Sequence, residues 1–150
     1  MAKKLLIIED DNDTSAELSE YYTQKGWTVV VAEGVAEARQ QLIDEDFNPH
    51  VILADLGLPD GSILDHLEEI HTQIDHSEWV FAFEASSRTD SADLARIDTL
   101  AYDFLEKPFD QARLDVVLSR ALRASKTTRR LASYSKSDNQ RYNLDAYIGT

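Results

Sequence analysis

The sequence predicts an α/β fold in which helices cover both faces of a doubly wound, five-stranded parallel sheet. Short apolar runs alternate along the chain with segments of helical periodicity, which is typical of repeated βα units. The apolar runs are continuous rather than alternating, as expected of strands that are buried on both faces. Five such units fit within residues 1–122.

The expected strands are short and rich in apolar residues. They cover Leu5–Ile8, Trp27–Ala32, Val51–Ala54, Trp79–Phe83 and Asp103–Leu105. Helical spacing of apolar residues predicts helices over residues 15–25, 34–43, 62–74, 90–100 and 110–131. The side chains of Asn12, Asp13 and Thr14 offer N-caps for the first helix, and Gly26 suits its C′ position.

Length and composition fit one globular domain with a single substantial core. The 150 residues include no cysteine, which excludes disulfides and thiolate metal sites. No apolar run reaches the length of about 18 residues that would span a membrane, and the apolar run near the N-terminus is too short for a signal peptide. We therefore expect a cytoplasmic protein with no membrane partner.

Charge is distributed unevenly along the chain. The formal net charge is −13, made up of −17 for residues 1–122 and +4 for residues 123–150. Binding to nucleic acid phosphates needs clustered lysine and arginine, which the acidic part lacks. We expect no direct contact with nucleic acid.

Two groups of residues receive simple interpretations. Tyr21 and Tyr22 are adjacent on the first expected helix, so they cannot both face the core. The four histidines lack the spacing of a metal site, and surface or edge positions are expected for His50, His66, His71 and His76.

Charged side chains follow the first, third, fourth and fifth expected strands and are candidates for a site. Because ligands of an open parallel sheet bind beyond the carboxyl ends of its strands, these side chains should converge on one rim. Clustered carboxylates are costly unless a cation neutralises them, and oxygen ligands without histidine or cysteine favour Mg²⁺. The residues at this rim are Glu9, Asp10, Asp11, Asp55, Glu84 and Lys107.

An acidic rim around Mg²⁺ suits phosphoryl transfer, because the ion also binds phosphate oxygens. Asp55 could act as the nucleophile that forms an aspartyl-phosphate. Lys107 would then supply a fixed positive charge to the phosphoryl oxygens.

Three motifs in register resemble the receiver domain of two-component response regulators. They are "LLIIEDD", "VILADLGLPDG" and "AYDFLEKPF", with 45 residues from Asp10 to Asp55 and 52 from Asp55 to Lys107. The resemblance covers residues 3–122 and implies a flavodoxin-like (βα)5 fold with strand order 2-1-3-4-5. It also implies a phosphoacceptor that is no enzyme beyond Mg²⁺-dependent self-phosphorylation and dephosphorylation, and a sensor histidine kinase as partner.

The resemblance assigns metal ligands residue by residue. Glu9 and Asp10 become the acidic pair that binds Mg²⁺, with Asp10 as the direct ligand and Glu9 acting through water. Asp11 is their neighbour and not a ligand. Asp55 becomes the phosphoacceptor and a metal ligand, and the backbone carbonyl of Gly57 completes the set.

The same resemblance gives roles to the last motif. Lys107 becomes the lysine that pairs with the phosphoryl group, and its peptide bond to Pro108 is commonly cis in the family. Phe104 takes the position of the aromatic switch residue.

Glu84 departs from the family pattern, which has threonine or serine followed by alanine at this position. An ionised Glu84 would repel a phosphoryl group by about 4 kcal/mol at ~4 Å if the effective dielectric constant is about 20. Glu84 could turn away or pair with Lys107, a hydroxyl could come from Ser86 or Ser87, or the domain could signal without phosphorylation. We favour retained phosphorylation with altered coupling.

Two rival functions follow from particular residues. A pseudo-receiver, which binds a partner without chemistry, would explain Glu84. A phosphatase with an aspartyl nucleophile would need a second acid two residues after Asp55, where Gly57 stands.

The C-terminal part of the sequence predicts an extension of the last helix and the start of an output domain. The apolar face of the last helix continues past residue 122, so the helix could pack wholly on its own sheet or pair two protomers as a short coiled coil. Both remain open, and a homodimer is the assembly we expect.

Residues 123–143 are interpreted as helix extension and polar linker. Residues 144–150, in "RYNLDAYIGT", resemble the opening of the ATPase module of sigma-54-type transcription activators and predict the start of a truncated output domain.

Overall fold

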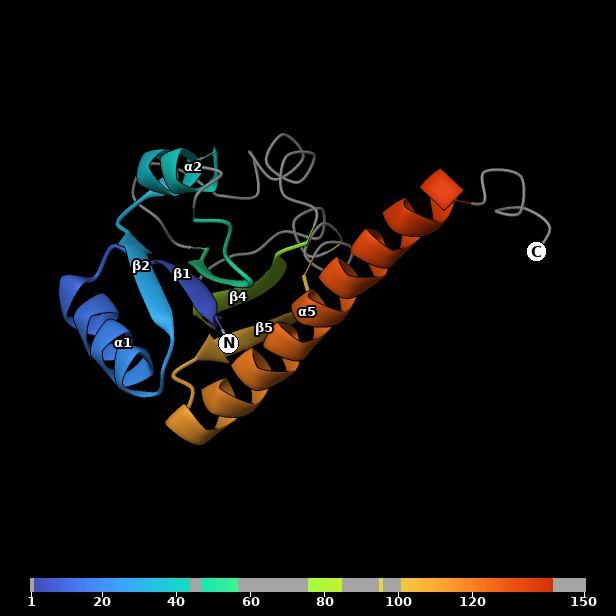
Figure 1. Cartoon of the computed structure of the whole chain (residues 1–150). Helices are drawn as coiled ribbons and strands as arrows, with labels where there is room; N and C mark the ends of the chain where they lie inside the picture. Colours follow the sequence, from blue (N-terminus) through green and yellow to red (C-terminus); the bar gives the residue numbers. More distant parts are fainter. Residues whose placement is uncertain (1, 44–46, 57–75, 85–94, 96–100, 142–150) are drawn as a thin grey trace.

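The computed structural model contains one five-stranded parallel sheet with the strand order β2-β1-β3-β4-β5 (Figure 1). It describes residues 2–43, 47–56, 76–84, 95 and 101–141. The predicted fold class and strand order are confirmed. The helices expected over residues 62–74 and 90–100 lie outside the described residues, apart from residue 95.

All five expected strands form, with ends that differ from the prediction by at most two residues. The strands are β1 (Lys4–Ile8), β2 (Thr28–Ala32), β3 (Val51–Asp55), β4 (Glu78–Glu84) and β5 (Asp103–Lys107). The described helices are α1 (Asn12–Gln24), α2 (Val35–Ile43) and α5 (Gln111–Arg141). Among them, none is long and apolar enough to cross a membrane.

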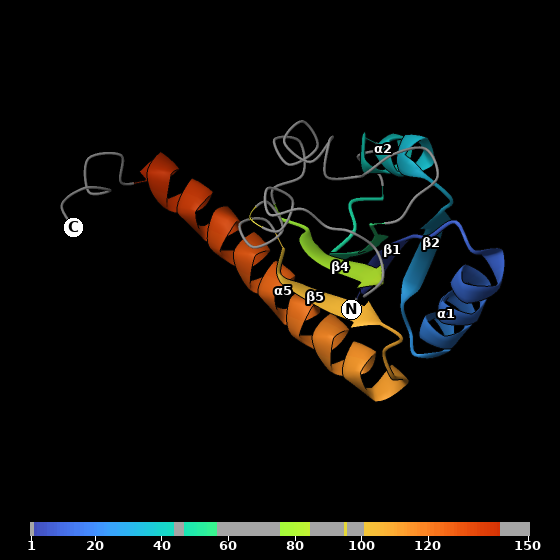
Figure 2. The ribbon, with the colours of Figure 1, turned by 180° about the vertical axis from the view of Figure 1, so that it is seen from behind.

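The core has two layers because successive strand residues face opposite sides of the sheet. Leu5 and Ile7 of β1 pack under α1 and α5, whereas Leu6 and Ile8 pack under α2. All four side chains are fully buried. Figures 1 and 2 show α1 and α5 on one face of the sheet and α2 on the other.

The first helix begins earlier than predicted because its N-cap is Asp11. The Oδ1 atom of Asp11 accepts a hydrogen bond from the backbone N–H of Asp13 at 3.1 Å, and Oδ2 accepts one from the Thr14 hydroxyl at 2.8 Å. The first of these bonds satisfies a backbone donor that the first turn of a helix leaves unpaired. Gly26 follows the C-cap with a φ of +94°, which confirms its predicted position.

The last helix is longer than predicted. It was expected to end at about Leu131, but α5 continues to Arg141 through residues that were interpreted as linker. Once the packed part of a helix has formed, each further residue adds a hydrogen bond without a new nucleation cost. Polar composition alone therefore did not end the helix. The domain boundaries at residues 122 and 143 remain predictions.

Both adjacent tyrosines of α1 reach the same residue of α5. Tyr22 is buried and Tyr21 is half-buried. The Tyr21 hydroxyl donates to Asp115 Oδ2 at 2.9 Å, and the Tyr22 hydroxyl donates to Asp115 Oδ1 at 2.8 Å. Tyr22 lies in the core and Tyr21 only at its edge, as expected of adjacent helix positions, and the length of the tyrosine side chain lets both hydroxyls meet one carboxylate.

Candidate functional site

The carboxyl ends of the central strands bring the expected site residues to one edge of the sheet. In the parallel register, Ile8 lies beside Ala54, Asp55 beside Ala82, and Glu84 beside Lys107. Glu9 and Asp10 follow β1 directly. The convergence expected from the sequence is therefore present.

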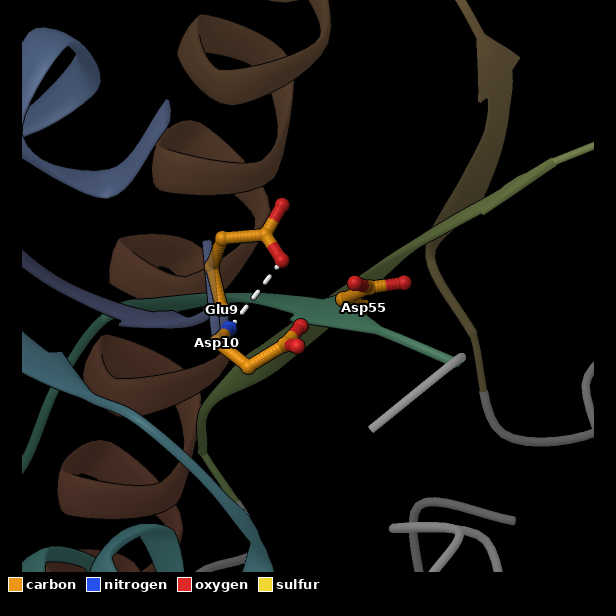
Figure 3. A group of neighbouring side chains, drawn as sticks. All are labelled: Glu9, Asp10 and Asp55. Atoms are coloured by element: carbon orange, nitrogen blue, oxygen red, sulfur yellow. Dashed lines mark hydrogen bonds between the residues drawn. The ribbon is translucent and has the colours of Figure 1, made fainter. Parts of the chain in front are cut away.

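Three carboxylates form a compact cluster at this edge (Figure 3). Glu9, Asp10 and Asp55 each offer an oxygen, and these oxygens lie within 4.8 Å of one another. Glu9 is buried, Asp55 is half-buried and Asp10 is exposed. Glu9 is oriented by the backbone N–H of Asp10, which donates to Glu9 Oε2 at 3.1 Å.

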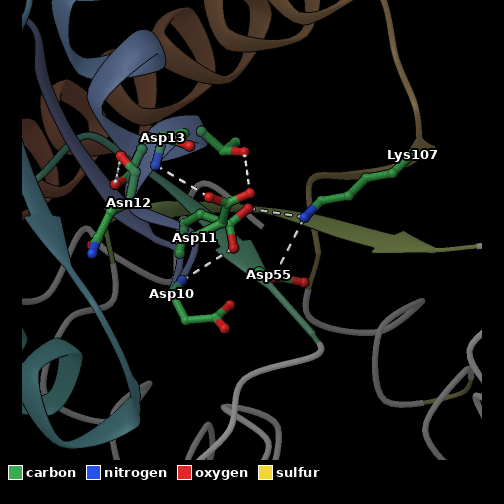
Figure 4. Close-up of polar contacts among 9 residues, drawn as sticks. Asp10, Asp11, Asn12, Asp13, Asp55 and Lys107 are labelled. Carbon is green, nitrogen blue, oxygen red and sulfur yellow. Dashed lines mark hydrogen bonds and ion pairs between the residues drawn. The ribbon is translucent and has the colours of Figure 1, made fainter.

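Lys107 reaches the cluster from the end of β5 (Figure 4). Its Nζ atom lies 2.9 Å from Glu9 Oε1 and 3.4 Å from Asp55 Oδ2. One ammonium therefore bridges two carboxylates. When all three carboxylates are ionised, they and the one ammonium carry a net charge of about −2, which a divalent cation would neutralise.

The proximity of Asp55 and the burial of Glu9 change the acidity of Glu9. Burial is the main cause that raises the pKa of Glu9 to about 7, and the neighbouring Asp55 carboxylate raises it further. The hydrogen bond from Lys107 acts in the opposite direction and only partly offsets them. The burial and crowding of this site thus disfavour the ionised form of Glu9.

Lys107 responds to the same neighbours. Burial by itself would lower the pKa of Lys107, but its hydrogen bond to Glu9 and the negative charge of Asp55 outweigh burial and raise that pKa. Lys107 consequently stays charged, as the fixed cation that the sequence predicts.

Asp11 has a structural role instead of a place in the cluster. Both of its carboxylate oxygens accept hydrogen bonds as the N-cap of α1, and the Thr14 hydroxyl is the main cause that lowers the pKa of Asp11. Its expected place beside the metal ligands remains a prediction. The sequence signal for the cap was an aspartate immediately before the first helical residue, a position at which aspartate is favoured.

Glu84 is exposed and ends β4 next to Lys107 in the register. It lies on the same side of the sheet as Ala82, two residues beyond the level of Asp55. The structure therefore places an acid at the rim where the family pattern has a hydroxyl. Gly57, Ser86 and Ser87 lie outside the described residues, so their expected roles remain predictions.

The segment around Lys107 has two further expected features. The peptide bond between Lys107 and Pro108 is cis. Phe104 is about half exposed on β5, and its ring lies 6.1 Å from that of Phe83. Its exposure leaves room for a change of position, as a switch residue requires.

The donor set fits Mg²⁺. Ligand oxygens at about 2.1 Å from the ion lie within about 4.2 Å of one another. The three carboxylate oxygens of the cluster lie within 4.8 Å of one another, which is only slightly farther apart. Because Asp10 is exposed, rotation of its side chain can close the difference. Glu9 already uses both oxygens within the protein, which suits a ligand that acts through water.

A flavodoxin-like sheet whose carboxyl edge gathers three acids and one lysine has the architecture of a receiver domain. The chain belongs to the response regulator receiver domain family, which matches residues 5–119. The resemblance seen in the three sequence motifs is thereby confirmed.

Comparisons with individual proteins agree with this family. The nitrogen assimilation regulatory protein NtrX of Azorhizobium caulinodans is 31% identical over 123 residues, which cover 81% of this chain and 26% of NtrX. The transcriptional regulatory protein KdpE of Staphylococcus aureus is 31% identical over 122 residues, which cover 78% of this chain and 50% of KdpE. The chain thus spans about a quarter to a half of the curated relatives it matches.

A solved structure supports the fold. The CheY-like receiver domain protein of Methanospirillum hungatei superposes with a TM-score of 0.74 at 19% identity, covering 85% of this chain and 99% of that one. At this identity the likeness concerns the fold alone.

Proposed function

We propose that the chain accepts a phosphoryl group from a sensor histidine kinase onto Asp55, with Mg²⁺ held by the neighbouring acids. The observation that carries the proposal is the joint contact of Lys107 Nζ with Asp55 and Glu9 at the carboxyl edge of the sheet. This arrangement places a carboxylate nucleophile, a cation for the phosphoryl oxygens and a metal-binding acid pair within one small site.

Each residue has a separate task in the proposed reaction. Asp10 and Asp55 would bind the ion directly, together with the backbone carbonyl of Gly57, and Glu9 would bind it through water. Bound Mg²⁺ supplies charge neutralisation for the phosphoryl oxygens. Lys107 would move from its pairing with Glu9 toward the new phosphoryl oxygens on Asp55, because they carry more negative charge.

Glu84 would weaken the response without preventing phosphorylation. Its carboxylate stands at the rim beside Lys107 in the register, and its exposure lets it turn away from a phosphoryl group. We expect Glu84→Gln and Glu84→Thr to bind beryllofluoride several-fold more tightly, since each removes a repelling charge. Equal affinity in all three proteins would exclude this role for Glu84.

The proposed output is control of transcription through a following domain. KdpE is a transcriptional regulator and NtrX a regulator of nitrogen assimilation by name. The resemblance of residues 144–150 to the start of a sigma-54-type ATPase module favours that class of output. We propose a homodimer as the assembly that phosphorylation controls, and a cytoplasmic location for the protein.

Phosphorylation can be tested on the whole chain with acetyl phosphate and Mg²⁺. We expect a phosphorylated species in mass spectra of the wild type and of Asp13→Asn, an exposed control on α1, and none with Asp55→Asn. An unchanged yield from Asp55→Asn would refute Asp55 as the acceptor. The absence of a phosphorylated species in the wild type would refute phosphorylation.

The second candidate is a pseudo-receiver, and the position of Glu84 at the rim is the observation that favours it. A pseudo-receiver would bind its partner without the ion. Titration with Mg²⁺, followed by tryptophan fluorescence, separates the two, because only the phosphoacceptor is expected to show saturable binding that Asp10→Asn weakens.

A further inference from the structure

The clearest feature outside the acid cluster is the point where α5 leaves the sheet. The helix packs on β3 and β4, and its buried positions run as far as Ser125, which is fully buried. Leu131 is already 62% exposed, and the helix continues to Arg141 (Figure 2). The helix α5 therefore passes from a fully buried position to a mostly exposed one within two turns after Ser125.

Two polar contacts hold this part of α5 at the amino-terminal edge of the sheet. The Ser125 hydroxyl donates to the carbonyl oxygen of His76 at 2.6 Å. One turn later, Arg129 Nη2 donates to the carbonyl oxygen of Pro49 at 2.7 Å and to that of Asn48 at 3.2 Å, with Asn48 Oδ1 at 3.4 Å. We call Arg129, Asn48 and Pro49 the exit clamp.

The turn that receives Arg129 is built to present carbonyl groups. Asn48 has a φ of 45°, in the left-handed region that asparagine tolerates better than most residues. The Pro49 carbonyl accepts from both the Ser77 hydroxyl at 2.5 Å and Arg129, so both of its lone pairs are used. Proline has no N–H, so its carbonyl is its one hydrogen-bonding group. The charged guanidinium makes stronger bonds to these carbonyls than a neutral donor would.

We propose that Arg129 is a positioning residue that fixes where, and in which direction, α5 leaves the receiver body. Without it, the Ser125 hydroxyl would still hold the preceding turn, and we expect the helix to tilt beyond that turn. The turn at Asn48 and Pro49 leads directly into β3, whose other end carries Asp55. The exit of α5 is thus attached to the same strand as the phosphoacceptor, at its opposite end.

The proposal can be tested by a distance between spin labels in the whole chain. The sequence contains no cysteine, so Thr23→Cys on α1 and Asp138→Cys on the α5 extension give two unique labels. Residue 138 lies nine helical steps beyond Arg129, roughly 13 Å along the axis, so a tilt of about 20° moves the label by roughly 5 Å. Labelled protein is diluted with unlabelled protein, so that distances within one chain are measured.

We expect one narrow distance distribution in the doubly labelled protein that is otherwise unchanged. The same protein with Arg130→Ala, a control at the exposed neighbouring position, should give the same distribution. Arg129→Ala should broaden or shift the distribution by roughly 5 Å, and Arg129→Lys should restore part of the order because its ammonium can still donate to Pro49. Arg129→Met keeps an unbranched stem if the alanine variant does not fold. A wild-type distribution in Arg129→Ala or Arg129→Met would overturn the proposal.

Discussion

At the scale of single residues, Glu9 carries the electrostatic cost of the acid cluster. Its carboxylate is buried beside Asp55, and a single ammonium from Lys107 serves both groups. Burial raises the pKa of Glu9 from 4.5 to about 7, so the folded protein prefers Glu9 protonated. The stability that this preference gives is present below pH 4.5 and is lost as the pH rises through 7.

Glu9→Gln should therefore stabilise the metal-free protein in neutral solution. We expect its free energy of unfolding to exceed that of the wild type by about 1 kcal/mol at about pH 7.5, and by little at about pH 4.5. This gain in free energy is smaller than the full pKa shift of Glu9 would give, because Glu9→Gln also deprives Lys107 of an ionised partner. Urea unfolding in the presence of a chelator measures the difference.

Glu17→Gln is the matched control, since Glu17 is exposed on α1. It removes the same charge at a site away from the cluster, so its pH dependence should follow the wild type. If Glu9→Gln and Glu17→Gln unfold alike at every pH, the crowding of Glu9 is not a source of instability.

Burial shifts the pKa of His50 in the opposite direction from that of Glu9, because His50 is a base. It was expected at the surface or an edge, and it lies at the amino end of β3, but buried. Its Nδ1 atom accepts a hydrogen bond from the backbone N–H of Lys4 at 3.1 Å, which requires a neutral ring. Burial, with further contributions from Arg129, Lys126 and Lys4, lowers the pKa of His50 to about 4.

Because this pKa lies below the unfolded value of 6.5, the neutral ring stabilises the fold above pH 6.5, and that stability is lost as the pH falls toward 4. His50→Asn keeps an acceptor near the position of Nδ1 and cannot be protonated. We expect the two proteins to unfold alike at about pH 7.5, and the wild type to be less stable by on the order of 1 to 2 kcal/mol at about pH 4.5. A difference that is independent of pH would contradict this.

At the scale of elements, the apolar runs predicted every strand, while helix ends depended on side chains that the pattern does not reveal. The start of α1 was set by a carboxylate cap at Asp11, and the end of α5 by propagation from a packed helix. Strand interiors are determined by burial, which leaves a strong signal in the sequence. Caps and helix extensions depend on one or two polar groups and leave a weak one.

The candidate site was more predictable than the contacts that support it. Lys107, Glu9 and Asp55 meet because parallel strands end at one edge, a rule that needs no side-chain detail. The contacts of Tyr22 with Asp115 and of Arg129 with Pro49 join residues 93 and 80 positions apart. Such pairs depend on how the helices lie across the sheet, which one sequence does not specify.

Tyr22→Phe tests how strongly α1 and α5 are joined. The hydroxyl of Tyr22 donates to Asp115 and accepts from Gln111 Nε2 at 2.8 Å, in a buried position. Removing it takes one hydrogen bond each from Asp115 Oδ1 and from the Gln111 amide, so we expect a loss of about 1 to 2 kcal/mol in the free energy of unfolding.

Tyr21→Phe is the comparison, because Tyr21 donates to the same carboxylate from a half-buried position. Water can replace its hydroxyl, and a loss below about 1 kcal/mol is expected. Urea unfolding followed by circular dichroism gives both values. Equal losses in the two variants would show that burial does not distinguish these bonds.

At the scale of the whole molecule, an acidic body carries a helix whose outer half is basic. Residues 1–122 have a net charge of −17 and residues 123–150 a net charge of +4. Figures 1 and 2 show the extension of α5 reaching past the sheet. Two copies that associate through this extension keep their acidic bodies apart, and salt would screen the remaining repulsion.

Leu131 is the described apolar residue of α5 most open to such a partner, with 62% of its surface exposed. In sedimentation equilibrium, we expect a dimer whose population rises with protein concentration and with salt, and which Leu131→Glu reduces. Ile43→Glu is the control, because Ile43 is 50% exposed on α2, on the other face of the sheet. It adds the same charge at a similar exposure and should leave association nearly unchanged. If Leu131→Glu and Ile43→Glu weaken association equally, added charge alone explains the loss, and the extension is not where two copies meet.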